Sequence, residues 1–147
     1  MSLKETLAND LKDAMRGRET IRKNTVQMVR AAILQVEKDQ RVTLGDEEII
    51  GVIAKELKKR KDVLPEYEKS GRDDLIDALK QEIAILTAYL PAQLSEEELL
   101  EIVRKAIAET GASSLKEMGK IMGIVLPQVK GKADGKAVNE AARKLLS

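Results

Sequence analysis

The chain of 147 residues contains no cysteine, histidine, phenylalanine or tryptophan, and its aromatic side chains are limited to Tyr67 and Tyr89. Without cysteine there are no disulfides and no thiolate metal sites, and a reducing compartment is expected. Without histidine the most common general base, the most common metal ligand and every His-dependent catalytic triad are missing. Two tyrosines are too few for a protein that reads bases by stacking them. We therefore expect no catalytic residue, no metal site and no cofactor.

Long apolar runs are absent as well. No segment approaches the roughly 18 apolar residues of a membrane span, and no signal-peptide core precedes a small-residue cleavage site. These absences predict a soluble cytoplasmic protein that makes no membrane contact.

Charge is balanced over the whole chain but not along it. The 26 Lys and Arg residues against 25 Asp and Glu residues leave a net charge of +1, so any anion site must be local. Residues 95–111 hold five acids and two bases, whereas residues 112–147 hold seven bases and three acids. The cationic last segment is where an anion would dock.

Apolar residues recur at helical spacing throughout, and no segment shows the alternation typical of a strand. Four longer helices are predicted in the first part of the chain. Gly17 should end the first helix, and Asp46 is the predicted N-cap of the third. Pro65 should bend or end that third helix, with Gly71 as its C-terminal cap. Pro91 should close the fourth.

Three shorter helices are predicted to follow. Ser95 with Glu98, and Ser114 with Glu117, match the capping-box pattern, and Asp134 is the predicted cap of the last helix. The whole pattern predicts an all-α protein of two small helical bundles. Leu90-Pro91-Ala92-Gln93 marks the predicted boundary, giving an N-terminal domain of residues 1–92 and a three-helix domain of residues 93–147.

The last third of the chain combines glycines and lysines at regular spacing. Gly119 and Gly123 lie four residues apart in a predicted helix, where each glycine costs about 1 kcal/mol relative to alanine. A helix face without side chains indicates that a ligand or partner approaches the backbone closely. The interleaved lysines indicate that this ligand is negatively charged. The candidate RNA- or anion-binding residues are Lys116, Gly119, Lys120, Gly123, Lys130, Gly131, Lys132 and Lys136.

Two details leave the nature of this candidate site open. The lysine-rich loop and the amides that begin the last helix would make a modest phosphate site, but Asp134 would satisfy the same amides. The simpler interpretation, typical of motifs this short, is that Gly119 and Gly123 let a neighbouring helix pack closely and that the lysines are solvated surface.

Several short motifs resemble those of the YqeY family over nearly the whole chain. In the N-terminal part they are Asp46-Glu47-Glu48, Ser70-Gly71-Arg72 and Glu82-Ile83. In the C-terminal part they are Leu90-Pro91, Leu94-Ser95 with Glu98, Met118-Gly119-Lys120 with Met122-Gly123, and Lys130-Gly131-Lys132-Ala133-Asp134-Gly135. That family shares its C-terminal part with the tail domain of the B subunit of the tRNA-dependent amidotransferase (GatB), so the last third resembles this tail. The resemblance implies a tRNA-binding or amidotransferase-associated accessory role. The candidate contacts that it implies are Gly119, Lys120, Gly123, Lys130, Gly131 and Lys132.

Three hypotheses on function follow. The first is a non-catalytic module that binds tRNA or another structured RNA through its backbone and shape. The second is a protein–protein adaptor, with Met118 and Met122 as anchors for a partner helix. The third is an amidotransferase-type carbon–nitrogen ligase with glutamine as amide donor, which the lack of cysteine and histidine disfavours.

Overall fold

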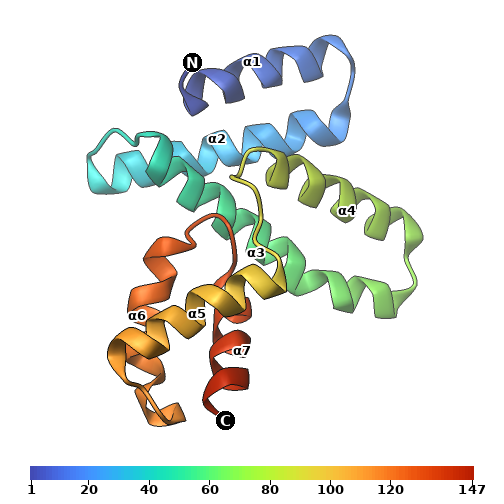
Figure 1. The fold of residues 1–147 in the computed structure, drawn as a ribbon. Helices are drawn as coiled ribbons and strands as arrows, with labels where there is room; N and C mark the ends of the chain where they lie inside the picture. The colour runs from blue at the N-terminus through green and yellow to red at the C-terminus, as the bar shows by residue number, and fades with distance from the viewer. The chain divides into compact units, whose positions relative to one another are not determined.

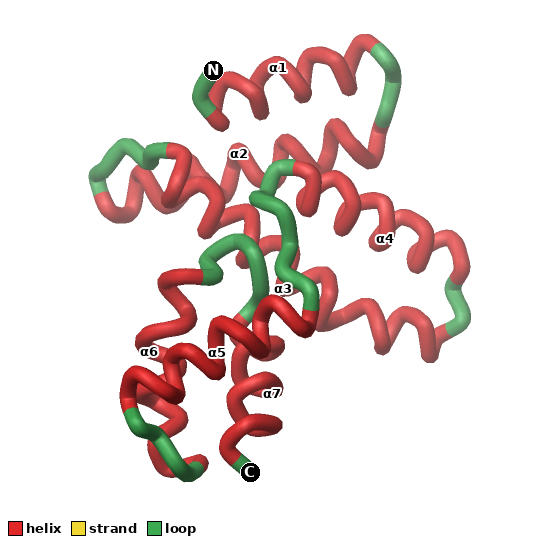
Figure 2. Tube along the Cα trace, viewed as in Figure 1, coloured by secondary structure: helices red, strands yellow, loops and turns green.

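The structure is a computed structural model that describes all residues 1–147, and it contains seven α-helices and no strand (Figures 1 and 2). The predicted all-α fold is confirmed. Two compact units divide the chain, Met1–Leu90 and Pro91–Ser147. The first holds α1 (Leu3–Arg16), α2 (Thr20–Gln40), α3 (Asp46–Ser70) and α4 (Asp73–Ala88). The second holds α5 (Glu96–Thr110), a short 3₁₀ helix η1 (Leu115–Glu117), α6 (Met118–Gln128) and α7 (Gly135–Leu146).

The core of the first unit forms where the apolar stripes of its helices meet. Helix α1 packs along α2, α3 packs along α4, and α2 contacts both α3 and α4. Across both units, no helix combines the length and the apolar composition that a membrane span requires. The buried cluster consists of Leu7, Val26, Val29, Ile33, Leu44, Ile49, Ile53, Leu57 and Leu86.

In this unit, two helices end at the glycines that were predicted to end them, and none ends at Pro65. Helix α1 ends at Gly17, and α3 ends at Gly71, whose φ of 70° is in the left-handed region that favours glycine. The prediction that α3 could end at Pro65 is wrong, because the helix continues through Pro65 to Ser70. The proline removes one backbone hydrogen bond from the helix, and residues 61–70 are exposed apart from the half-buried Leu64.

The start of α3 differs from the prediction in one residue. Gly45, not Asp46, is the N-cap, and its N–H donates to the carboxylate of Glu48 at 3.1 Å. Asp46 accepts instead from the backbone N–H of Leu3 at 2.9 Å, which ties the start of α1 to the start of α3. Asp46 is the first residue of α3, but its carboxylate accepts from the first residue of α1.

A buried arginine joins α3 to α4. Arg60 is 8% exposed, and its Nη1 donates to the carboxylate of Glu56 at 3.0 Å. Its Nε lies 3.7 Å from the carboxylate of Glu82 on α4. Because a buried charge is costly unless it is paired, the two carboxylates make the burial of this guanidinium tolerable.

The second unit has its own core, in which α5, α6 and α7 all contact one another. Each helix contributes one apolar row, and the half-buried Leu94 also packs against the cluster. The buried residues are Leu99, Val103, Ala106, Ala112, Ile121, Val125, Val129, Val138, Ala141 and Ala142.

The Glu37 carboxylate gives the first unit a pH dependence that can be tested. Glu37 forms an ion pair with Lys4 and accepts from the N–H of Leu44 at 2.8 Å, and these contacts lower the pKa of Glu37 below its ordinary 4.5. A lowered folded-state pKa contributes stability above the ordinary value, and this stability is lost as the pH falls through the folded-state pKa. We therefore expect Glu37→Gln to lower the melting temperature at neutral pH, and the difference from wild type to shrink on acidification below pH 4.5.

Circular dichroism melting curves over this pH range would measure the effect. Glu66→Gln is the matched control, because the exposed Glu66 makes no ion pair. A wild-type advantage over Glu37→Gln that stays constant into acid would contradict the assignment.

Candidate lysine-rich binding surface

Helix α6 turns one row of residues into the core of the second unit and the opposite row outward. Ile121 and Val125 are fully buried on the inward row, which continues to Val129 just after the helix. A helix rotates about 100° per residue, so Gly119 and Gly123 fall on the opposite side. Both glycines are exposed.

No part of the protein packs onto these two glycines. A Cβ atom built at Gly119 or at Gly123 has no other heavy atom within 4 Å, apart from the backbone of α6 itself. The interpretation that the glycines admit a neighbouring helix of the same chain is therefore wrong. What remains is a stretch of helix whose backbone is uncovered.

The five candidate lysines are all exposed and lie near the two ends of α6. Lys116 belongs to η1 and Lys120 to the first turn of α6. Lys130 and Lys132 lie in the turn that follows α6, and Lys136 lies in the first turn of α7. None of the ion pairs in the chain includes any of these five ammonium groups.

Two nearby acids are engaged elsewhere. Glu117 accepts from the backbone N–H of Ser113 at 2.7 Å, and Asp134 accepts from that of Ala137 at 2.8 Å. The predicted capping box of Ser114 with Glu117 is wrong, because the Ser114 side chain makes no capping bond. The positive excess of this segment survives with both carboxylates counted, because residues 112–147 hold seven bases and only three acids.

At the start of α7, one of the amides that a phosphate would use is already engaged. The carboxylate of Asp134 already accepts from the helix amide that an anion would use. A Cβ at Gly135 would lie 3.9 Å from Cδ2 of Leu126, so the end of α6 adjoins the start of α7. An anion at this helix end would therefore compete with the carboxylate of Asp134.

Gly131 differs from the other candidate residues because it is buried. Its φ of 77° lies in the left-handed region, which a glycine adopts without strain. The N–H groups of Lys132 and Ala133 both donate to the carbonyl of Val129, at 2.8 and 3.1 Å. Gly131 thus shapes the turn from which Lys130 and Lys132 leave, and its own surface is covered.

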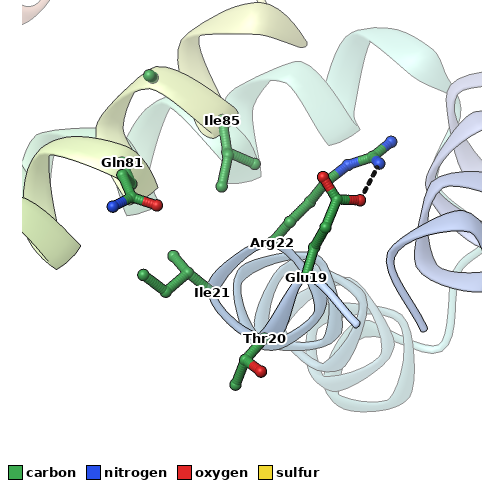
Figure 3. Close-up of a pocket in the computed structure, with 7 residues that line it drawn as sticks. Glu19, Thr20, Ile21, Arg22, Gln81 and Ile85 are labelled. Carbon is green, nitrogen blue, oxygen red and sulfur yellow. Dashed lines mark hydrogen bonds and ion pairs between the residues drawn. The ribbon is translucent and has the colours of Figure 1, made fainter. Parts of the chain in front are cut away.

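A groove in the first unit offers a different kind of surface. It has a volume of about 530 Å³ and lies between the start of α2 and the middle of α4, where Ile21 and Ile85 line it (Figure 3). The cation of Arg22 is paired with Glu19 at 2.9 Å and with Asp10 at 3.5 Å, and the hydrogen bond to Glu19 raises the pKa of Arg22. The groove is mainly apolar.

The sequence places this two-unit helical protein in a known class. The model of the YqeY-like protein family matches residues 4–146, and the chain therefore belongs to this family. The motifs recognised at the C-terminal end are thus part of a similarity that covers nearly the whole chain.

Individual relatives share part of this similarity. The chain is 28% identical over 130 residues to altered inheritance of mitochondria protein 41 of Pyrenophora tritici-repentis, covering 86% of this chain and 71% of that protein. It is 35% identical over 136 residues to the protein of the same name from Kluyveromyces lactis, covering 90% and 69%. It is also 40% identical over 60 residues to one component of the glutamyl-tRNA(Gln) amidotransferase of Methanospirillum hungatei, covering 37% of this chain and 10% of that component.

The expected cytoplasmic location is contradicted by these relatives. The Pyrenophora and Kluyveromyces proteins are both named as mitochondrial. The lack of cysteine indicates only a reducing compartment, and this property cannot single out the cytoplasm.

Alanine at the two open glycines should stabilise the second unit. Gly119→Ala and Gly123→Ala each remove backbone freedom from the unfolded chain and add no clash, so we expect each to raise the free energy of unfolding by about 0.4–1 kcal/mol. Urea denaturation followed by circular dichroism would measure this. Gly131→Ala is the control and should destabilise, because its positive φ strains a side chain. Destabilisation by the first two substitutions would mean that their Cβ positions are occupied.

Proposed function

We propose that this protein is a non-catalytic accessory protein that binds structured RNA, such as tRNA, and acts in association with a tRNA-dependent amidotransferase. The observation that carries the proposal is the lysine surface of the second unit. This surface consists of the five exposed, unpaired lysines and the two open glycines of α6, namely Lys116, Gly119, Lys120, Gly123, Lys130, Lys132 and Lys136.

The dimensions of α6 suit a nucleic-acid backbone. Its 11 residues span about 16 Å at 1.5 Å per residue, with lysines near each end and uncovered backbone at Gly119 and Gly123. Phosphates of an RNA backbone can follow such a stretch closely, because no side chain projects from the glycines. Lysine ammonium groups bind phosphate as mobile point charges, which positions a nucleic acid without reading its sequence.

Composition favours paired or compactly folded RNA over an unstacked single strand. Residues 91–147 contain no aromatic side chain, so the second unit has no platform on which a base could stack. The contacts that remain are with phosphates and with 2′-hydroxyl groups. The similarity to part of a glutamyl-tRNA(Gln) amidotransferase supports tRNA as the RNA and tRNA amidation as the setting.

A catalytic role as a carbon–nitrogen ligase has less support. The chain offers neither cysteine nor histidine, and the groups with shifted pKa values are explained by structural contacts. Backbone and side-chain hydrogen bonds to Ser95 lower the pKa of Glu98 within the capping box that begins α5. Burial and the hydrogen bond to Asp10 raise the pKa of Tyr89, which keeps this phenol protonated at the end of α4. Neither group is poised to transfer a proton near neutral pH.

The adaptor hypothesis has less support. Met118 and Met122 are half-buried and pack against the core of the second unit, so each offers a partner helix only part of its side chain. The exposed residues of α6 are Gly119, Lys120, Gly123, Leu126, Pro127 and Gln128, and the other four lysines lie in the segments next to the helix. RNA therefore fits the observed surface better than an apolar helix does.

Charge reversal on the lysine surface should remove RNA binding without unfolding the protein. We expect Lys120→Glu combined with Lys132→Glu to weaken binding of a tRNA by on the order of 10- to 100-fold at about 0.1 M salt. For the wild type, log Kd should rise with log salt concentration with a slope of about 4 to 5 if all five lysines contact phosphates. Fluorescence anisotropy at several salt concentrations would measure both quantities.

Lys12→Glu combined with Lys55→Glu is the matched control. These two exposed lysines of the first unit also form no ion pair, so the change in net charge is the same. The control should retain most of the affinity. Equal losses in both double variants would mean that only overall charge matters, and an unchanged affinity in Lys120→Glu with Lys132→Glu would refute the proposed surface.

A further inference from the structure

The segment that links the two units also builds the turn that carries Lys130 and Lys132. Nε2 of Gln93 donates to the carbonyl of Gly131 at 2.7 Å, across 38 positions of sequence, and to the carbonyl of Pro91 at 3.0 Å. One carboxamide group thus joins the start of the second unit to the turn between α6 and α7. We infer that Gln93 is a positioning residue for the lysine surface, an inference that rests on the proposed RNA-binding function.

A second tie lies beside the first. The backbone N–H of Leu94 donates to the carbonyl of Lys132 at 3.0 Å, and the Leu94 side chain packs against the core of the second unit. Two successive carbonyls of the turn, those of Gly131 and Lys132, therefore accept from two successive residues of the linking segment. We call these two hydrogen bonds, from Gln93 to Gly131 and from Leu94 to Lys132, the clamp; they join segments that are far apart in sequence.

The clamp matters because Gly131 is buried. Its carbonyl would lose the Gln93 donor on substitution, and a buried backbone carbonyl without a partner is unfavourable. The turn would then shift to expose that carbonyl to water. Lys130 and Lys132 are the two neighbours of Gly131 in the chain. Any such shift of the turn therefore changes the direction in which both lysine side chains project.

Gln93 itself is uncharged and exposed, so it contributes no electrostatic attraction of its own. An effect of its substitution on RNA binding must act through the turn. This separates a positioning role from direct charge loss, because the total charge of the lysine surface stays the same.

Gln93→Met in the intact chain tests this role, because methionine keeps the length of the side chain and removes the donor. With a synthetic RNA hairpin as the probe, we expect affinity to fall about three- to tenfold at about 0.1 M salt, roughly the contribution of one lysine–phosphate contact. The salt slope should fall by about one to two, because Lys130 and Lys132 no longer both reach phosphates. Hydrogen exchange at the Leu94 amide should become faster.

Gln128→Met is the matched control, since Nε2 of Gln128 donates only to the carbonyl of Ile124 within α6. It should leave affinity, salt slope and Leu94 exchange unchanged. Gln93→Asn, which keeps the amide but shortens its reach, should behave as Gln93→Met does. Helix content from circular dichroism should stay at the wild-type level in all three variants.

The outcomes separate this inference from the proposed function. Wild-type affinity and salt slope in Gln93→Met would overturn the positioning role while leaving RNA binding intact. A wild type that does not bind the hairpin would overturn the proposed function and the inference together. Weaker binding with an unchanged salt slope would also contradict the inference, because both lysines would still be making their contacts.

Discussion

The burial of one row of α6 is the constraint on which the candidate surface depends. Ile121 and Val125 are fully enclosed between α5 and α7, and their burial fixes the rotation of the helix about its axis. Once that rotation is fixed, Gly119 and Gly123 must point away from the core. Each glycine weakens an isolated helix, so the packing of the opposite row supplies the stability that this bare side lacks.

Residues 112–147 carry a local excess of positive charge on a chain that is nearly neutral overall. Glu98, Glu117 and Asp134 each accept hydrogen bonds from backbone N–H groups and thereby stabilise helix starts or turns. None of these three carboxylates forms an ion pair with a lysine of the surface, and lysines outnumber the acids over residues 112–147. A field of this kind acts over about 10 Å at 0.1 M salt, so it favours close, salt-sensitive contact over long-range steering.

The sequence predicted those features that depend on neighbours in the chain. Gly17 and Gly71 ended helices as expected, because the conformational freedom of glycine is a local property. Pro65 did not end α3, which continues to Ser70, because a proline removes one hydrogen bond and can kink a helix without terminating it. The candidate glycines were found from their spacing, but only the three-dimensional packing revealed that nothing covers them. The role of Gln93 had no sequence signal, because its partner lies 38 residues away.

The most direct test of the account is to map the contact surface of an RNA on the folded protein. Backbone amide chemical shifts of the isotope-labelled intact chain, recorded during titration with tRNA, would report contacts residue by residue. The account predicts that the largest changes occur at Gly119, Lys120, Gly123 and residues 130–136. Changes confined to residues 1–90, or none at RNA concentrations well above that of the protein, would contradict it.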